Sequence, residues 1–261
     1  MPHKNILVIR GKAPCNNNCI FCVEKQSPFH QQAPNTKKIL SMITANNKYT
    51  MLGFAAGEPT LNKDIFKIIV HAKNHGFQDF QIVSNFRALS KAELVLKFLK
   101  IGVRYFDISL HVCDQETAIN LNKIKTPEKA LQEALQGLKN LFILAKKLKI
   151  KIFITHKIVI TPFNVKKLNQ IFDLTFNLGI RNYLIQPLVL MKFSPDLIKK
   201  LLVRKKDTIP YLNELIKKAE KNQAKIKLYN YSPQELISSD IIEFENNAIN
   251  NIGDKQKDFA F

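Results

Sequence analysis

The sequence predicts an α/β fold in which repeated strand–helix units surround a parallel sheet. Short runs of apolar and β-branched residues alternate with longer segments of helical period, which is typical of βα units. The chain has 261 residues, of which 46% are hydrophobic, so it is long enough to bury the core of one barrel domain. The predicted strands are residues 5–11, 50–56, 79–84, 104–112, 151–160 and 182–190, and the predicted helices are residues 36–46, 62–75, 90–101, 126–149, 164–178 and 208–222.

Start and stop signals support the boundaries of these helices. Ser90 and Glu93 have the spacing of a capping box at the start of the third helix, and Pro127 occupies a first-turn position in the fourth. A glycine follows three of the helices, where a left-handed residue commonly ends a helix; these glycines are Gly76, Gly102 and Gly179.

The chain changes character at about residue 225, which predicts a main domain over 1–224 and a C-terminal extension over 225–261. The extension begins with an alternating segment, 225–231, that predicts one more short strand. Residues 233–242 are then predicted to form a helix. Residues 246–258, which are rich in Asn and Asp, are predicted to form a loosely held tail.

Three of the four cysteines lie in one eight-residue segment, as Cys15-x3-Cys19-x2-Cys22. Thiolates this close in sequence can bind one soft metal centre, and iron–sulfur clusters are held by cysteine sulfur. A [4Fe–4S] cluster with three cysteine ligands keeps one iron open, and an open metal position can react with a bound molecule. Two other interpretations remain open: a zinc site completed by His30, and an electron-transfer cluster with Cys113 as its fourth ligand.

Polar residues recur where the predicted strands end, which is where a parallel barrel builds its active site. They suit a ligand rich in hydrogen-bonding groups, and a lysine among them could meet a carboxylate or a substrate anion. Alternation along the fourth and fifth strands predicts that Ser109 and His111 share one face and that Lys157 points inward. The candidate binding residues are Gly57, Glu58, Pro59, Ser84, Asn85, Ser109, His111, Lys157 and Gln186.

The cysteine spacing, with Phe21 directly before the last cysteine, resembles the signature of the radical S-adenosylmethionine (radical SAM) superfamily. One βα unit downstream, Gly57-Glu58-Pro59 resembles the Gly-Gly-Glu-Pro motif of that family. The resemblance implies a partial (β/α)6 TIM-like barrel with two cofactors, a [4Fe–4S] cluster and S-adenosylmethionine. It also implies an enzyme in which the reduced cluster cleaves S-adenosylmethionine to a 5′-deoxyadenosyl radical, which takes hydrogen from the substrate.

The resemblance further implies roles for single residues. Glu58 would help to orient the amino group of S-adenosylmethionine, the backbone near Phe21 would meet the adenine, and Ser109 would contact the methionine carboxylate or the ribose. Ser84 and Asn85 occupy the place of the family's polar pair, although they could instead form only a turn. His111 and Gln186 are candidate contacts for adenosine or substrate, and His111 could equally be a packed imidazole.

The match departs from the family at two loop positions, because Ala56 and Phe86 stand where glycine is usual. The sixth strand also lacks the family's glycine pattern.

Cys113 lies just past the fourth strand. It is a candidate catalytic residue that could donate a hydrogen atom or bind a second cluster, and the alternative is an ordinary, partly buried thiol.

The net charge of +19 suits an acidic electron donor such as flavodoxin or ferredoxin as partner. Nucleic acid is not the favoured partner, because arginine, which dominates phosphate recognition, occurs only five times.

We expect a cytoplasmic protein. No apolar run predicts a secretory signal or a membrane span, and the clustered cysteines suit a reducing compartment. The substrate is expected to be a peptide, a protein or a small molecule, with RNA or a nucleotide as the alternative.

Overall fold

The computed structural model describes residues 5–10, 14–26, 34–188, 193–231, 236, 242–245 and 259–260. Its strands form one sheet in the order β8-β7-β6-β5-β4-β3-β2-β1-β9, and each neighbouring pair is parallel. The strands are β1 (Ile6–Arg10), β2 (Met51–Ala55), β3 (Asp79–Ser84), β4 (Val103–Ser109), β5 (Phe153–Ile160), β6 (Asn182–Pro187), β7 (Lys225–Tyr229), β8 (Ile242–Glu245) and β9 (Phe259–Ala260).

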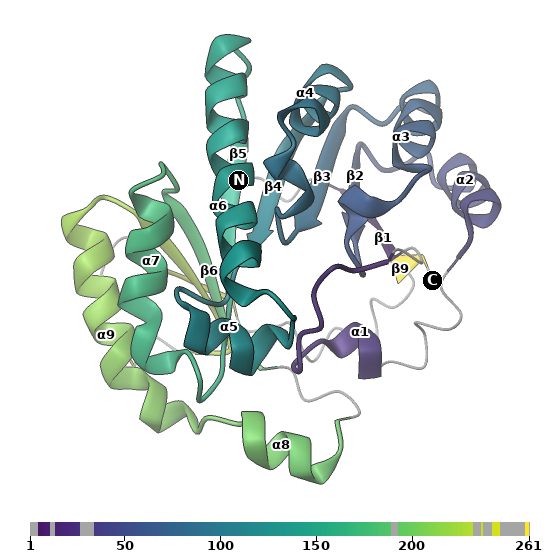
Figure 1. The fold of residues 1–261 in the computed structure, drawn as a ribbon. Coiled ribbons are helices and arrows are strands. Elements are labelled where there is room, and N and C mark those ends of the chain that lie inside the picture. The colour runs from purple at the N-terminus through teal and green to yellow at the C-terminus, as the bar shows by residue number, and fades with distance from the viewer. Residues whose placement is uncertain are drawn as a thin grey trace.

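The helices lie outside this curved sheet and across one of its ends. Figure 1 shows α2, α3, α4, α6, α7 and α9 on the outer side, and α1, α5 and α8 near the end where the strands finish. The arrangement confirms the predicted α/β fold of the partial TIM-like barrel type. The α-helices are α1 (Val23–Gln26), α2 (Thr36–Ala45), α3 (Ile65–Asn74), α4 (Ala92–Lys100), α5 (Gln115–Asn122), α6 (Pro127–Lys147), α7 (Leu168–Phe176), α8 (Pro195–Leu201) and α9 (Lys205–Lys221), and the 3-10 turns are η2 (Pro59–Leu61), η3 (Ala88–Ser90) and η4 (Val165–Lys167).

Strands β1 to β6 confirm the six predicted strands, and β7 confirms the short strand predicted after residue 225. The predicted helix over 233–242 is wrong at its last residue, because Ile242 begins β8. Apart from residue 236, the rest of that segment lies outside the described residues. The predicted tail at 246–258 lies outside them as well.

None of the helices in the described ranges combines the length and the apolar character that crossing a membrane requires.

Two local predictions about helix starts were wrong or incomplete. Ser90 does not form a capping box with Glu93, because Ser90 belongs to η3 and α4 starts after Lys91, which makes no side-chain cap. The sequence pattern also missed α5, whose inward face mixes polar and apolar residues and so lacks a clear apolar stripe. A capping box does form there, between Asp114 and Thr117.

Strand β5 shows how the sheet separates its two faces. Ile154, His156, Ile158 and Ile160 are buried, and the residues between them are half-buried, as the predicted alternation requires. His156 is buried under the helices, where its ring nitrogens lie 3.0 Å from Oγ1 of Thr175 and 2.6 Å from the carbonyl oxygen of Leu110. The face that carries Lys157 is therefore the inner face of the barrel.

Two residues that replace a usual glycine adopt left-handed backbone conformations. The φ angle is 72° at Ala56 and 64° at Phe86, a region that side chains other than glycine rarely occupy. These angles explain physically why glycine is usual at both positions. The turn at Phe86 packs tightly under α6, because a Cβ atom built on Gly137 would overlap the carbonyl oxygen of Phe86 and lie 3.1 Å from Cβ of Leu89.

Replacing Gly137 by alanine is therefore expected to destabilise the protein by roughly 1–3 kcal/mol, the usual cost of overpacking. Intrinsic helix propensity alone predicts the opposite sign, a gain of about 1 kcal/mol. Urea unfolding of the variant measures the difference, and Gln136→Ala, at an exposed position on the same helix, is the control. A Gly137→Ala variant more stable than wild type would contradict the observed packing.

Candidate active site

The loop that carries the three cysteines runs from β1 to α1 and is held by backbone hydrogen bonds from two sides. The Glu58 N–H donates to the carbonyl oxygen of Pro14 at 3.0 Å, which ties the loop to the end of β2. The Asn18 and Ile20 N–H groups donate to the carbonyl oxygens of Asn122 and Leu121, both at 2.9 Å, at the last turn of α5. The helix that the sequence pattern missed thus positions the cysteine loop.

Two side chains from the turn after β3 hold the same loop, and Glu133 of α6 supports one of them. The Arg87 guanidinium donates to the carbonyl oxygen of Asn16, to Oδ1 of Asn17 at 2.9 Å and to Oε2 of Glu133 at 2.8 Å. The Asn85 amide donates to Oδ1 of Asn16 at 2.7 Å. Sequence reasoning missed Arg87 and Asn16, and the one available signal was an arginine directly behind the predicted polar pair in a chain with few arginines.

The three thiols lie close enough to influence one another. Burial raises the pKa of the Cys19 thiol to about 12, and the charges of Cys22 and Cys15 raise it further in the same direction. Burial likewise raises the pKa of Cys15. Within the described residues no group of three or more His, Cys, Asp or Glu side chains is arranged as a metal site. The donor set nevertheless fits an iron–sulfur cluster in number and kind, because one loop carries three cysteines and such clusters are held by cysteine sulfur.

Glu58 joins the ends of β2 and β3 through a buried carboxyl group. Its Oε1 accepts from the Thr60 N–H at 3.2 Å, the Thr60 hydroxyl at 2.6 Å and the Ser84 hydroxyl at 2.7 Å, and its Oε2 accepts from the Asn85 N–H at 2.7 Å. Burial raises the pKa of Glu58, and these hydrogen bonds oppose that shift. The structure thus brings Glu58, Ser84 and Asn85 together by bonding them to one another, and their contact with S-adenosylmethionine stays a prediction.

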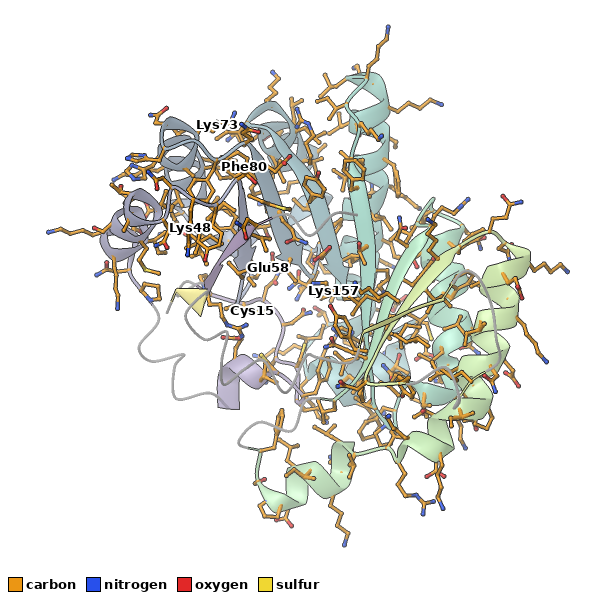
Figure 2. The ribbon with its side chains drawn as sticks, turned by 180° about the vertical axis from the view of Figure 1, so that it is seen from behind. Cys15, Lys48, Glu58, Lys73, Phe80 and Lys157 are labelled. Atoms are coloured by element: carbon orange, nitrogen blue, oxygen red, sulfur yellow. The ribbon has the colours of Figure 1, made fainter. Side chains whose placement is uncertain are left out.

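A polar cluster occupies the inner face of the barrel. Lys157 Nζ lies 2.7 Å from Oδ2 of Asp107, and the Gln81 amide donates to the same oxygen at 2.8 Å. Asp107 is buried and Lys157 is half-buried, which agrees with the inward direction predicted for Lys157. Ser109 is the neighbour of Lys157 in the β4–β5 register. Figure 2 shows Cys15, Glu58 and Lys157 in the middle of the molecule, away from Lys48 and Lys73 at its outer side.

Two rings connect the cysteine loop with the sheet. The buried Phe21 meets the edge of His111 at a centroid distance of 4.9 Å and an interplanar angle of 87°. Nδ1 of His111 accepts a hydrogen bond from the Val159 N–H at 3.1 Å. Burial lowers the pKa of His111 to about 3, so this imidazole is neutral. His111 thus packs against Phe21, and its contact with adenosine or substrate stays a prediction. Gln186 is half-buried near the end of β6.

Cys113 lies at the rim, on the side of α5 and α7. Its Sγ is 3.6 Å from Oδ2 of Asp114 and 3.5 Å from Oε1 of Gln170. Burial and the neighbouring charge of Asp114 raise the pKa of its thiol to about 11. A catalytic role for Cys113 stays a prediction. His30, the residue considered for a zinc site, lies outside the described residues.

Comparison with known proteins decides the family. The model of the radical SAM superfamily matches residues 14–175, which include the cysteine loop and strands β2 to β5. The chain belongs to the radical SAM superfamily. Membership makes it an enzyme of the radical SAM type and confirms the predicted cofactors, because the superfamily uses a [4Fe–4S] cluster and S-adenosylmethionine. It also implies the need for a reductant, and the zinc-protein and electron-carrier interpretations do not hold for an enzyme of this kind.

Similar proteins include several that are named probable GTP 3′,8-cyclase. A probable GTP 3′,8-cyclase of Sulfurisphaera tokodaii is 23% identical over 232 residues, which cover 88% of this chain and 68% of that protein. A second, from Saccharolobus islandicus strain Y.N.15.51, is 23% identical over 230 residues, covering 87% and 69%.

Solved structures show the same fold at lower identity. Streptococcus suis SuiB bound to the precursor peptide SuiA is 14% identical with a TM-score of 0.63; the match covers 97% of this chain and 51% of SuiB. This chain therefore spans about half the length of that protein. TYW1 with a lysine–pyruvate adduct is 16% identical with a TM-score of 0.57, and the match covers 84% and 74%.

In this radical SAM protein, replacing Arg87 by methionine is expected to loosen the cysteine loop and to lower cluster retention. Each hydrogen bond from a charged donor stabilises by about 1.5–3 kcal/mol, and methionine makes none of them. Iron per chain after anaerobic gel filtration measures the effect. Arg104→Met is the matched control, because Arg104 donates to the carbonyl oxygens of Leu99 and Val103, where β4 begins. Equal iron contents in the two variants would contradict the positioning role of Arg87.

Proposed function

We propose that this enzyme holds a [4Fe–4S] cluster with Cys15, Cys19 and Cys22 and uses S-adenosylmethionine to abstract hydrogen from a substrate. The observation that supports the ligand set best is the seating of the cysteine loop at the end of β1, bonded to the end of β2 and to the last turn of α5. When bound, the cluster supplies the electron that cleaves the sulfonium and so yields the 5′-deoxyadenosyl radical.

The protein's own residues bind and orient S-adenosylmethionine in this proposal. Gly57, with a φ angle of 58°, lets the backbone approach the ligand, while Glu58 keeps the ends of β2 and β3 in register. The half-buried Lys157, which pairs with Asp107 at 2.7 Å, is proposed to meet an anionic group of the ligand or the substrate. Contacts to the ligand or substrate are proposed for the backbone at Phe21 and Pro59 and for Ser84, Asn85, Ser109, His111 and Gln186.

The substrate is proposed to be a small molecule, a peptide or a protein, as the sequence favours. A nucleotide is the second candidate, because probable GTP 3′,8-cyclases match 87–88% of this chain. The electron donor is proposed to be an acidic protein such as flavodoxin or ferredoxin, because the chain carries a net charge of +19.

Anaerobic purification followed by metal and product analysis tests the proposal. We expect iron and sulfide near the ratio of a four-iron cluster, and 5′-deoxyadenosine after addition of S-adenosylmethionine and dithionite. Zinc without any 5′-deoxyadenosine would contradict the proposal. Adding GTP or candidate peptides in the same assay separates the substrate classes, since the correct substrate is consumed together with S-adenosylmethionine.

A further inference from the structure

Two histidines at the C-terminal end of α3 converge on one hydroxyl group of α2. Nε2 of His71 lies 3.1 Å from Oγ1 of Thr44, and Nε2 of His75 lies 3.3 Å from the same atom. The two rings face each other at a centroid distance of 4.1 Å and an interplanar angle of 31°. Thr44 is exposed and both histidines are half-buried, so ions from solvent can reach this cluster.

Hydrogen bonding already presents one of these nitrogens as a ligand. Nδ1 of His75 lies 2.8 Å from the carbonyl oxygen of His71, which can only accept, so Nδ1 carries the proton. Nε2 of neutral His75 is therefore an acceptor, and its lone pair is directed toward the Thr44 hydroxyl at 3.3 Å. A backbone carbonyl that fixes the tautomer in this way is the usual support of a metal-binding imidazole.

The second imidazole needs one change of tautomer. Nε2 of His71 lies 3.1 Å from the carbonyl oxygen of Leu40, so in the metal-free state this nitrogen donates a hydrogen bond. Moving its proton to Nδ1 gives up that bond and leaves a lone pair on Nε2, 3.1 Å from Oγ1 of Thr44. A divalent metal ion of intermediate softness would bind both rings at once. The free energy of this chelate can offset the loss of a single hydrogen bond.

Helix geometry and electrostatics favour a cation at this place. Residues four apart on a helix lie on the same face, and paired imidazoles at this spacing bind zinc in helical metal motifs. His71 lies in the last turn of α3 and His75 is its C-cap residue, so both stand at the helix end with partial negative charge.

We propose that His71 and His75 form a binding site for a divalent transition-metal ion, at the end of the sheet opposite the cysteine loop. The helix α3 leads into the start of β3, whereas the cysteine loop follows the end of β1, and the two strands run parallel through β2. Figure 1 shows α2 and α3 side by side on the outer side of the sheet. The site has two imidazole ligands, and water or the Thr44 hydroxyl completes the coordination.

Equilibrium dialysis of the whole protein against Ni²⁺, with metal analysis of the retained ion, tests this site. We expect one histidine-dependent Ni²⁺ per chain and no corresponding Mg²⁺, because imidazole suits nickel and oxygen ligands suit magnesium. His71→Ala and His75→Ala should each weaken binding about tenfold or more, since each removes the chelate. Asn74→Ala, at an exposed position of the same helix, should leave it unchanged. Circular dichroism confirms that the variants fold.

The variant Thr44→Val separates a metal site from a mere hydrogen-bonded bridge between α2 and α3. A metal site keeps both imidazoles in this variant, so Ni²⁺ binding should persist within a few fold. Ni²⁺ binding that survives in both histidine variants would place the ion elsewhere, for example on the cysteines, and would overturn the proposal. Absence of Ni²⁺ binding to the wild-type protein would overturn it as well. Neither result depends on cleavage of S-adenosylmethionine.

Discussion

Replacing Cys19 by alanine is expected to abolish cluster assembly and the cleavage of S-adenosylmethionine together. Two thiols remain in the loop, and no histidine, cysteine or carboxylate of the described residues is arranged with them to supply a third ligand. Visible absorbance, iron per chain and 5′-deoxyadenosine formation should all fall to the level of a cluster-free sample.

Cys113→Ala is the matched control for this prediction. Its thiol contacts Asp114 and Gln170 at the rim, so the variant is expected to keep its iron. Loss of iron in Cys113→Ala would make Cys113 a cluster ligand and would contradict the three-cysteine site. Retained cleavage of S-adenosylmethionine with loss of the final product would instead support the role of Cys113 as a hydrogen-atom donor.

Replacing Glu58 by alanine is expected to lower the free energy of unfolding by roughly 3 kcal/mol or more. The change leaves the hydroxyl of Ser84, the N–H of Asn85 and both donors of Thr60 without their acceptor, and each buried unsatisfied group costs about 1–3 kcal/mol. The ends of β2 and β3 should also separate, because Glu58 joins them. Urea unfolding and iron retention measure the two consequences.

Glu116→Ala provides the control for the loss of a carboxylate. The side chain of Glu116 is 76% exposed and pairs with Lys167 at 2.6 Å, and exposed ion pairs stabilise by at most about 1 kcal/mol. Unfolding of Glu116→Ala should therefore resemble that of the wild type. Equal stabilities of the Glu58 and Glu116 variants would show that the buried hydrogen bonds do not hold the strand ends.

The fold could be predicted because its signals are local. Alternation along β5 and the glycines after α3, α4 and α7 depend only on neighbouring residues, and all three of these glycines have the positive φ angle expected of a helix stop. Helix α5 was not predicted, because its buried face includes Thr117 and Asn122 and therefore lacks a continuous apolar stripe. The Ser90–Glu93 pair had the right spacing, but the chain forms η3 at that point.

The sequence predicted which residues lie at the candidate site better than it predicted the contacts that these residues make. The polar residues at the strand ends do lie at one edge of the sheet, because parallel strands finish together. Ser84 and Asn85 instead bond with Glu58, and Lys157 pairs with Asp107, so these groups are partly satisfied within the protein. Arg87 was not predicted, since nothing in its neighbours indicates a partner 71 positions away.

By itself, the sequence determined the cysteine spacing, the strand–helix order and hence the family, because each of these features depends on a short stretch of neighbouring residues. Only the tertiary structure decided that α5 and Arg87 hold the cysteine loop. It also decided that the turn at Phe86 packs against Gly137, where a larger residue would not fit, and that His71 and His75 contact Thr44. Those contacts join residues from different elements. Their approach depends on strand register and helix packing, which a local pattern does not encode.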